Sequence, residues 1–181
     1  MAARVWTIGH SNRPLDALLD TLASHGIELV ADVRRFPGSG SQPHFAGAAI
    51  AGSLAARGIA YAWIPALGGR RRARPDSPND GWTHPAFRAY ADHVGSEEFA
   101  DGLFELAMLA RGLRTAIMCA EAQWWRCHRR LIADVLVFAG FDVEHIFDAR
   151  RADTHRLERP ARVVAGRLSY ASAAAAVAPS A

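Results

Sequence analysis

The sequence contains no lysine: all 21 residues counted as lysine or arginine are arginine. This absence excludes Schiff-base catalysis, which needs an amine, and the phosphate-binding loop whose motif ends in a lysine. The preference for arginine is typical of GC-rich coding, and an arginine-specific phosphate-binding surface is the alternative interpretation. The formal net charge is only +3, so the composition gives weak support to a nucleic-acid partner.

Cysteine and long hydrophobic runs are also scarce. The two cysteines, Cys119 and Cys127, are too few for a secreted disulfide scaffold, and residues 1–13 show no leader pattern. The longest apolar stretch, residues 131–141, is interrupted by Asp134 and is far shorter than the roughly 20 residues of a membrane-spanning helix. We therefore expect a cytoplasmic protein with no membrane partner.

The composition that remains, 50% hydrophobic and 22% charged over 181 residues, is typical of one globular domain. Apolar, strand-like segments alternate with amphipathic, helix-like ones, and these strands are expected at residues 5–11, 28–35, 59–67, 115–121 and 142–147. The alternation predicts an α/β fold with a single open, mostly parallel sheet of about five strands and helices on both faces. We expect the α/β domain over residues 1–150, a C-terminal extension over 151–181, and disorder over 170–181.

Polar side chains gather where the predicted strands end. The strands end at His10 and Ser11, at Asp32 and Arg34, before Gly68 and Gly69, and at Cys119 and Glu121. In an open parallel sheet, ligands bind beyond the carboxyl ends of the strands. The sequence therefore predicts a site at this edge.

Five motifs in one order resemble domain-of-unknown-function family 488, DUF488. They are TIGHS at 7–11, DVR at 32–34, LGG at 67–69, CAE at 119–121 and CHR at 127–129. The resemblance extends from about residue 5 to residue 146. It implies a bacterial or archaeal single-domain α/β protein, and it brings no activity with it.

Cys127 is the candidate nucleophile. We expect it in the first turn of a helix over residues 124–139, where the helix N-terminus and the neighbouring Arg126, His128 and Arg129 would lower a thiol pKa. A buried packing thiol and a metal ligand are the alternatives. Cys119 is expected mainly to pack in the core.

The acids and imidazoles near this edge carry alternatives of their own. Glu121 is the candidate acid or base, unless it only forms an ion pair with an arginine. Asp32 and Arg34 alternate onto one face of their strand, where they form either a catalytic acid with an anion contact or a structural ion pair. His10 is a catalytic candidate, and Ser11 is a ligand contact or a helix cap.

Other motifs are weak or missing. Cys127 and His128 would point about 100° apart as neighbours on a helix, and no close Cys-x-x-Cys pair is present, so we predict no metal site. The nucleophile elbow of serine hydrolases is absent from the sequence. The arginines at positions 70, 71, 72 and 74 form a positive patch that reads as a solvated loop, a lid or a nucleic-acid contact.

Together these residues favour an enzyme that acts on an anionic, nucleotide-like or phosphorylated small molecule. The catalytic candidates are Cys127, Glu121, Asp32 and His10, and the substrate-contacting candidates are Arg34, Arg129, Ser11, Gly68, Gly69, His128 and Cys119. The alternatives are a nucleotide- or nucleic-acid-binding module without catalysis and a thiol or metal sensor. The sequence specifies no cofactor, reaction class or oligomeric state.

Overall fold

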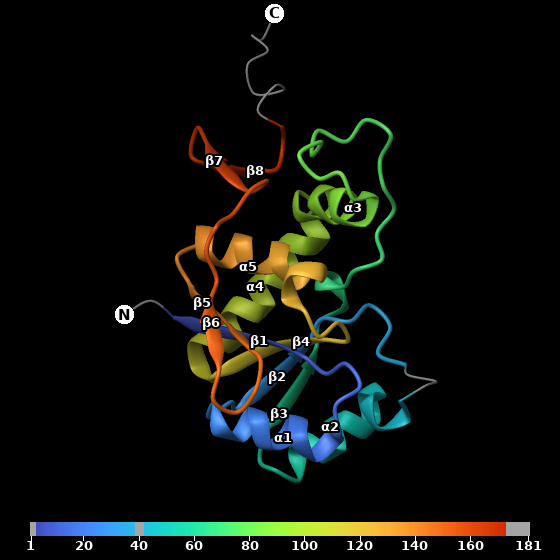
Figure 1. The fold of residues 1–181 in the computed structure, drawn as a ribbon, viewed down its shortest axis with the longest axis vertical. Coiled ribbons are helices and arrows are strands. Elements are labelled where there is room, and N and C mark those ends of the chain that lie inside the picture. The colour runs from blue at the N-terminus through green and yellow to red at the C-terminus, as the bar shows by residue number, and fades with distance from the viewer. Residues whose placement is uncertain (1–2, 39–41, 173–181) are drawn as a thin grey trace, which may run out of the picture.

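The computed structural model describes residues 3–38 and 42–172, and within them it forms a six-stranded sheet of order β3-β2-β4-β1-β5-β6 (Figure 1). The first five strands are parallel, and β6 pairs antiparallel with β5 at one edge. Their bounds are β1 (Arg4–Gly9), β2 (Leu29–Asp32), β3 (Ala60–Trp63), β4 (Thr115–Cys119), β5 (Asp142–Ile146) and β6 (Ala152–Thr154). The predicted open, mainly parallel α/β sheet is confirmed.

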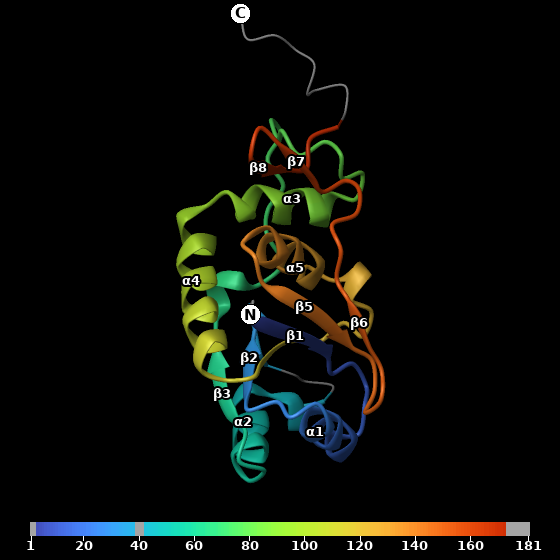
Figure 2. The ribbon, with the colours of Figure 1, turned by 90° about the vertical axis from the view of Figure 1, so that its left-hand side faces the viewer.

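Helices cover both faces of the sheet. They are α1 (Leu15–Ser24), α2 (Gly47–Ala55), α3 (Pro85–Val94), α4 (Glu97–Gly112) and α5 (Arg129–Phe138). Helices α1 and α2 pack on one face of the sheet, whereas α4 and α5 pack on the opposite face (Figure 2). This two-sided cover follows from the parallel strands, whose connections must cross over the sheet.

The strands are apolar on both sides because each face is covered. Along β1, Val5 contributes to the core under α4 and α5, whereas Trp6 and Ile8 contribute to the core under α1 and α2. Strand β4 alternates in the same way, with Met118 on one side and Cys119 on the other. The side chain of Cys119 therefore points to the α5 face.

The order of the strands creates a switch point between β1 and β4. These two strands are neighbours, with Gly9 opposite Cys119, yet β1 continues into α1 on one face and β4 continues into α5 on the other. Such a point leaves a crevice at the carboxyl ends of the two strands. His10 follows β1 directly, and Glu121 lies two residues after the end of β4.

Several elements differ from the predictions. The helix expected over 124–139 begins as a short 3-10 helix, η3 (Trp124–Arg126), and α5 starts only at Arg129. The edge strand β6 and the hairpin of β7 (Arg162–Val164) with β8 (Arg167–Ser169) were not predicted, because each has only three residues. Two further 3-10 helices, η1 (Pro43–Phe45) and η2 (Pro65–Leu67), lie in the loops after β2 and β3.

The C-terminal extension packs onto the domain. Ala161 and Tyr170 are buried in the same apolar cluster as α4 and α5. Tyr170 opens the stretch predicted to be disordered, and its burial corrects that prediction at residue 170, while residues 173–181 lie outside the described part of the chain. None of the described helices is long and apolar enough to cross a membrane.

Candidate functional site

A cavity of about 930 Å³ lies at the switch point. Of the residues proposed from the sequence, those that line it are His10, Ser11, Arg34, Gly69, Cys119, Glu121, Cys127 and His128. Asp32, Gly68 and Arg129 are absent from its lining and pack behind it. The carboxyl edge of the sheet thus brings together most of the predicted site.

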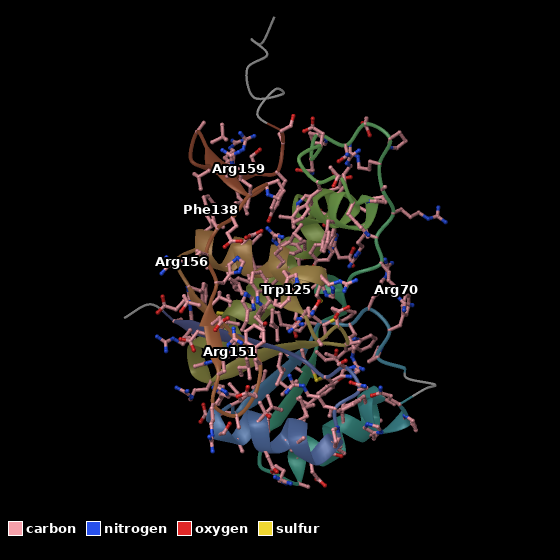
Figure 3. The ribbon with its side chains drawn as sticks, viewed as in Figure 1. Arg70, Trp125, Phe138, Arg151, Arg156 and Arg159 are labelled. Carbon is pink, nitrogen blue, oxygen red and sulfur yellow. The ribbon has the colours of Figure 1, made fainter. Side chains whose placement is uncertain are left out.

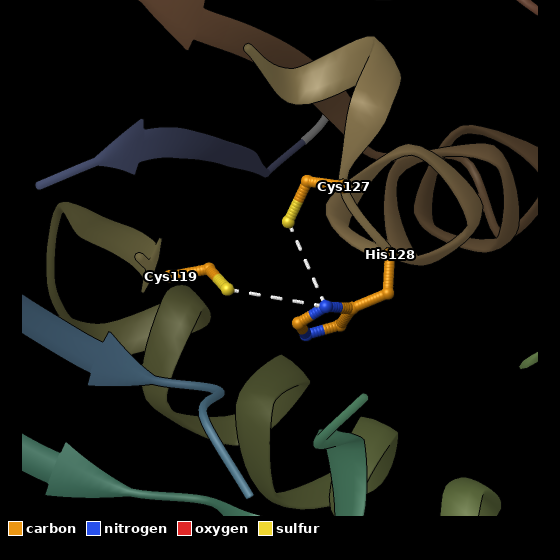
Figure 4. Close-up of side chains that lie close together, drawn as sticks. All are labelled: Cys119, Cys127 and His128. Carbon is orange, nitrogen blue, oxygen red and sulfur yellow. Dashed lines mark hydrogen bonds between the residues drawn. The ribbon is translucent and has the colours of Figure 1, made fainter. Parts of the chain in front are cut away.

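Two thiols and one imidazole meet in the wall of this cavity. His128 Nδ1 lies 3.6 Å from Cys127 Sγ and 3.9 Å from Cys119 Sγ, and the three side chains converge on one point (Figure 4). Both cysteines are free thiols and almost fully buried. Among the described residues, Cys119, Cys127 and His128 form a group whose ligand atoms lie close enough together to bind one metal ion.

The backbone explains why neighbouring residues reach the same point. Cys127 is extended (φ −120°, ψ 152°), and only His128 has helical angles, at the position that caps α5. Neighbouring residues diverge by about 100° only when both are helical, and because Cys127 is extended, its side chain and that of His128 lie on the same side. Cys119 approaches from the end of β4, on the face that α5 covers.

The two thiols differ in acidity. Burial alone would raise the pKa of the Cys127 thiol, but a hydrogen bond from Cys119 and the electrostatic influence of the neighbouring His128 and Arg129 outweigh burial and hold this pKa well below its usual range. The hydrogen bond to Cys127 and burial raise the pKa of Cys119. Cys127 is therefore the thiolate of the pair, and Cys119 supports it as a donor.

Arg129 supports Cys127 from behind. Its side chain is 1% exposed, and its Nε lies 3.5 Å from Cys127 Sγ. The remaining donors bind Thr7 Oγ1 and the carbonyl oxygens of Glu121 and Ala122. The donors of Arg129 thus contact protein atoms, and its side chain is absent from the cavity lining.

Arg34 and Asp32 form a buried ion pair. Arg34 Nε lies 2.8 Å from Asp32 Oδ1, and its NH2 lies 2.5 Å from Oδ2. Tyr61 donates to the same carboxylate, and Arg34 also donates to the carbonyl of Phe45. This is the structural ion pair that the sequence left as an alternative, and it fixes the loop after β2.

His10 is held between a carbonyl and a guanidinium. Its Nδ1 lies 2.9 Å from Ser11 O, which makes Nδ1 the donor, and its Nε2 lies 3.2 Å from the NH1 of Arg34. Burial, followed by the charge of Arg34, lowers the pKa of His10 although its hydrogen bond to Ser11 opposes this. The ring is therefore neutral and forms a fixed wall of the cavity, stacked on Phe45.

Glu121 presents an exposed carboxylate to the cavity, where one oxygen accepts from the N–H of Gln123 at 3.1 Å. The chain at Glu121 passes so close to β1 that a Cβ on Gly9 would lie 2.0 Å from the Glu121 carbonyl oxygen. Glycine at position 9 is therefore needed for the two strand ends to meet. This close approach places Glu121 beside His10.

Three arginines that were not among the predicted site residues also face the cavity. Arg35, Arg70 and Arg126 line the cavity and are exposed, and Arg70 extends from the surface loop after η2 (Figure 3). The guanidiniums of Arg70 and Arg126 have no hydrogen-bond or ion-pair partner among the described residues. Arg71, by contrast, is tied to Glu98 and to the carbonyl of Gly68. Only part of the predicted positive patch therefore faces the cavity.

The comparisons with known proteins agree with the motifs. The model of the family described as "Domain of unknown function DUF488" matches residues 14–136, which excludes the TIGHS motif but includes both thiols, His128 and the Asp32–Arg34 pair. Searches of the curated proteins and of the solved structures find no match. Because the matched segment covers more than half of the sequence, the chain belongs to the DUF488 family.

Proposed function

We propose that the protein is an enzyme that acts on an anionic small molecule, nucleotide-like or phosphorylated, in the cavity at the switch point. The observation that supports this proposal most directly is the composition of the cavity wall. A thiol cluster stands on one side, and the exposed, unpaired guanidiniums of Arg70 and Arg126 stand around it. Free guanidiniums bind phosphate and carboxylate groups through paired hydrogen bonds.

The residue roles follow from accessibility. Arg70 and Arg126 bind the anion in place of the buried Arg34 and Arg129, whose donors are engaged by the protein. In the metal-free chain the Cys127 thiolate bonds to the electrophilic atom of the substrate as the bond from that atom to the leaving group breaks, and Glu121 at the cavity mouth gives its proton to the leaving group. His10 and Gly69 shape the pocket. The two buried free thiols are typical of a reducing compartment, which supports a cytoplasmic location.

The binding step is tested with small anions. Inorganic phosphate, pyrophosphate and nucleoside phosphates are titrated into the metal-free protein while the melting temperature and the binding heat are recorded. Replacement of Arg70 and Arg126 by glutamine should weaken the binding of the best anion at least about tenfold, since charge-assisted hydrogen bonds contribute about 1.5–3 kcal/mol each. The matched control is Arg74→Gln, because Arg74 is exposed on the same loop but pairs with Asp76.

Turnover of the bound anion is then followed in the wild type, Cys127→Ser and Glu121→Gln. Both substitutions should abolish it. Binding that is unaffected by the Arg70 and Arg126 substitutions would overturn the proposed anion site. Salt-sensitive binding of oligonucleotides without turnover would instead favour the nucleic-acid-binding alternative.

A further inference from the structure

The thiol cluster has the dimensions of a metal site. A tetrahedral zinc ion with ordinary bond lengths requires a nitrogen–sulfur separation of about 3.6 Å and a sulfur–sulfur separation of about 3.8 Å. The observed nitrogen–sulfur separations are 3.6 and 3.9 Å, and all three donor atoms lie within 4.8 Å of one another. Both nitrogen–sulfur separations therefore match those of a tetrahedral zinc site to within a few tenths of an ångström.

His128 is oriented as a ligand. Its Nε2 lies 3.0 Å from the carbonyl oxygen of Val33, and because a carbonyl can only accept, Nε2 carries the proton. In the neutral ring, Nδ1 is then left with a lone pair that points at both sulfurs (Figure 4). Metal-binding histidines are commonly held in this way, by a backbone carbonyl on the other ring nitrogen.

Hydrogen bonding alone leaves the cluster incompletely paired. Both sulfurs face Nδ1 of His128, at sulfur–nitrogen distances that are long for a strong interaction. The adjacent backbone also leaves space, because Gly69 has no side chain and a Cβ there would lie only 3.0 Å from His128 Nδ1. An ion would satisfy all three donors at once.

We propose that Cys119, Cys127 and His128 bind a thiophilic divalent transition metal such as zinc, with its fourth coordination position open to the cavity. All three residues line that cavity. Three protein ligands with one open position are typical of catalytic rather than structural zinc sites. Two thiolates would neutralise the ion, and the guanidinium of Arg129 would leave one excess positive charge beside it, which suits an anionic substrate.

This inference rests on the proposed function only in sharing its cavity. A Cys127 thiolate that is bound to a metal ion is not free to attack a substrate. The metal-free and metal-loaded chains therefore present different groups to the cavity. In the metal-free chain the sulfur faces the cavity, and in the loaded chain a water molecule on the ion does so.

The test uses the full chain, reduced and stripped of metal, and cobalt(II) as a spectroscopic probe for zinc. We expect about one cobalt ion per chain, with a thiolate-to-cobalt charge-transfer band and the visible bands of tetrahedral coordination. Zinc should displace the cobalt and remain bound after dialysis. Absence of the charge-transfer band in the wild type would overturn the proposal without reference to any variant.

The ligands are then tested one at a time. Cys119→Ser, Cys127→Ser and His128→Gln should each lower zinc affinity by more than about 100-fold, beyond the loss expected for a supporting residue. Gly69→Ala keeps all three ligands but crowds the imidazole, and it should lower the affinity about tenfold. The matched control is His84→Gln, because His84 lines the same cavity but contacts Phe87 and the backbone of Ala86.

Circular dichroism of each metal-free variant separates loss of binding from loss of fold. Zinc affinity that is equal in the wild type and the double variant of Cys119 and Cys127 would contradict the proposal. That result would leave anion binding through Arg70 and Arg126 intact, because that experiment is done without metal. Conversely, a metal-loaded protein that binds no anion would overturn only the proposed function.

Discussion

Two polar clusters lie side by side behind the strand ends, and they differ in how completely they are paired. The first is the thiol cluster of Cys119, Cys127 and His128, which opens to the cavity. The second, the buried relay, consists of Thr7, His145, His155, Asp134 and Tyr170. Arg129 contacts both, through Cys127 Sγ and Thr7 Oγ1.

The buried relay has a fixed direction. Arg129 can only donate, so Thr7 Oγ1 accepts a hydrogen bond from it. The hydroxyl of Thr7 then donates to His145 Nδ1, 2.7 Å away. His145 Nε2 then donates to His155, and His155 Nε2 donates to Asp134 at 2.8 Å. Each group thus has a defined role, and the relay connects a buried cation to a buried carboxylate.

The difference between the clusters separates structure from function. The relay is buried and fully paired, which is typical of a network that holds a unique fold. The thiol cluster is joined by long sulfur–nitrogen contacts and faces a cavity, which is typical of a site that binds a ligand. The following experiments test this contrast.

Removal of the carboxylate should have the largest effect on stability. Asp134 is 1% exposed and accepts from both His155 and Tyr170. Asp134→Ala should lower the free energy of unfolding by about 3–5 kcal/mol, as for other broken buried charge networks. Urea unfolding measures this loss. The control Asp142→Ala removes an exposed carboxylate paired with Arg4 and should cost less than about 1 kcal/mol. Equal losses would show that the relay is not a structural network.

Acid should weaken the relay at a pH where exposed histidines have no such effect. Burial, together with the charges of His155 and Arg129, lowers the pKa of His145 to about 2. Below about pH 6.5, His145 therefore binds a proton in the unfolded chain but not in the folded chain. The free energy of unfolding falls as the pH falls. Between pH 6.5 and pH 5 this one group should cost about 2 kcal/mol.

The measurement compares urea unfolding of the wild type and of His145→Leu across this range. His10 and His93, whose pKa values burial also lowers, remain in both proteins, so their contributions cancel. The variant is less stable throughout, but its stability should fall less steeply with acid. Identical pH slopes would mean that His145 does not remain neutral in the folded chain.

The thiols should matter least for folding. Cys119→Ala and Cys127→Ala should each lower the unfolding free energy of the metal-free chain by about 1 kcal/mol, the typical cost of a small side chain. The same variants should lower zinc affinity by more than about 100-fold, as the serine variants do. A loss as large as that of Asp134→Ala would assign the thiols to the structural core.

The strands and their ends could be predicted because apolar periodicity and strand-end polarity are local signals. Residues His10, Cys119 and Glu121 therefore reached the cavity as expected. The thiol–imidazole geometry could not be predicted, because it depends on an extended Cys127 between η3 and α5 within a segment whose composition favours one continuous helix.

The buried relay had one local signal. Asp134 interrupts the most apolar stretch of the sequence, and a lone carboxylate among buried residues requires a partner. Its partners could not be named, because His155 and Tyr170 come from an extension with little periodic pattern. They are identified only in the structure, where the extension brings His155 and Tyr170 to Asp134 on α5.

Tyr170 has a consequence for where the folding unit ends. The DUF488 match stops at residue 136, yet His145, His155 and Tyr170 lie beyond it. A fragment that ends at residue 136 would keep every thiol-cluster residue. It would leave the carboxylate of Asp134 in an apolar interior without its partners His155 and Tyr170. The contacts of the extension continue to Ser172, whose N–H and hydroxyl donate to the carboxylate of Asp80.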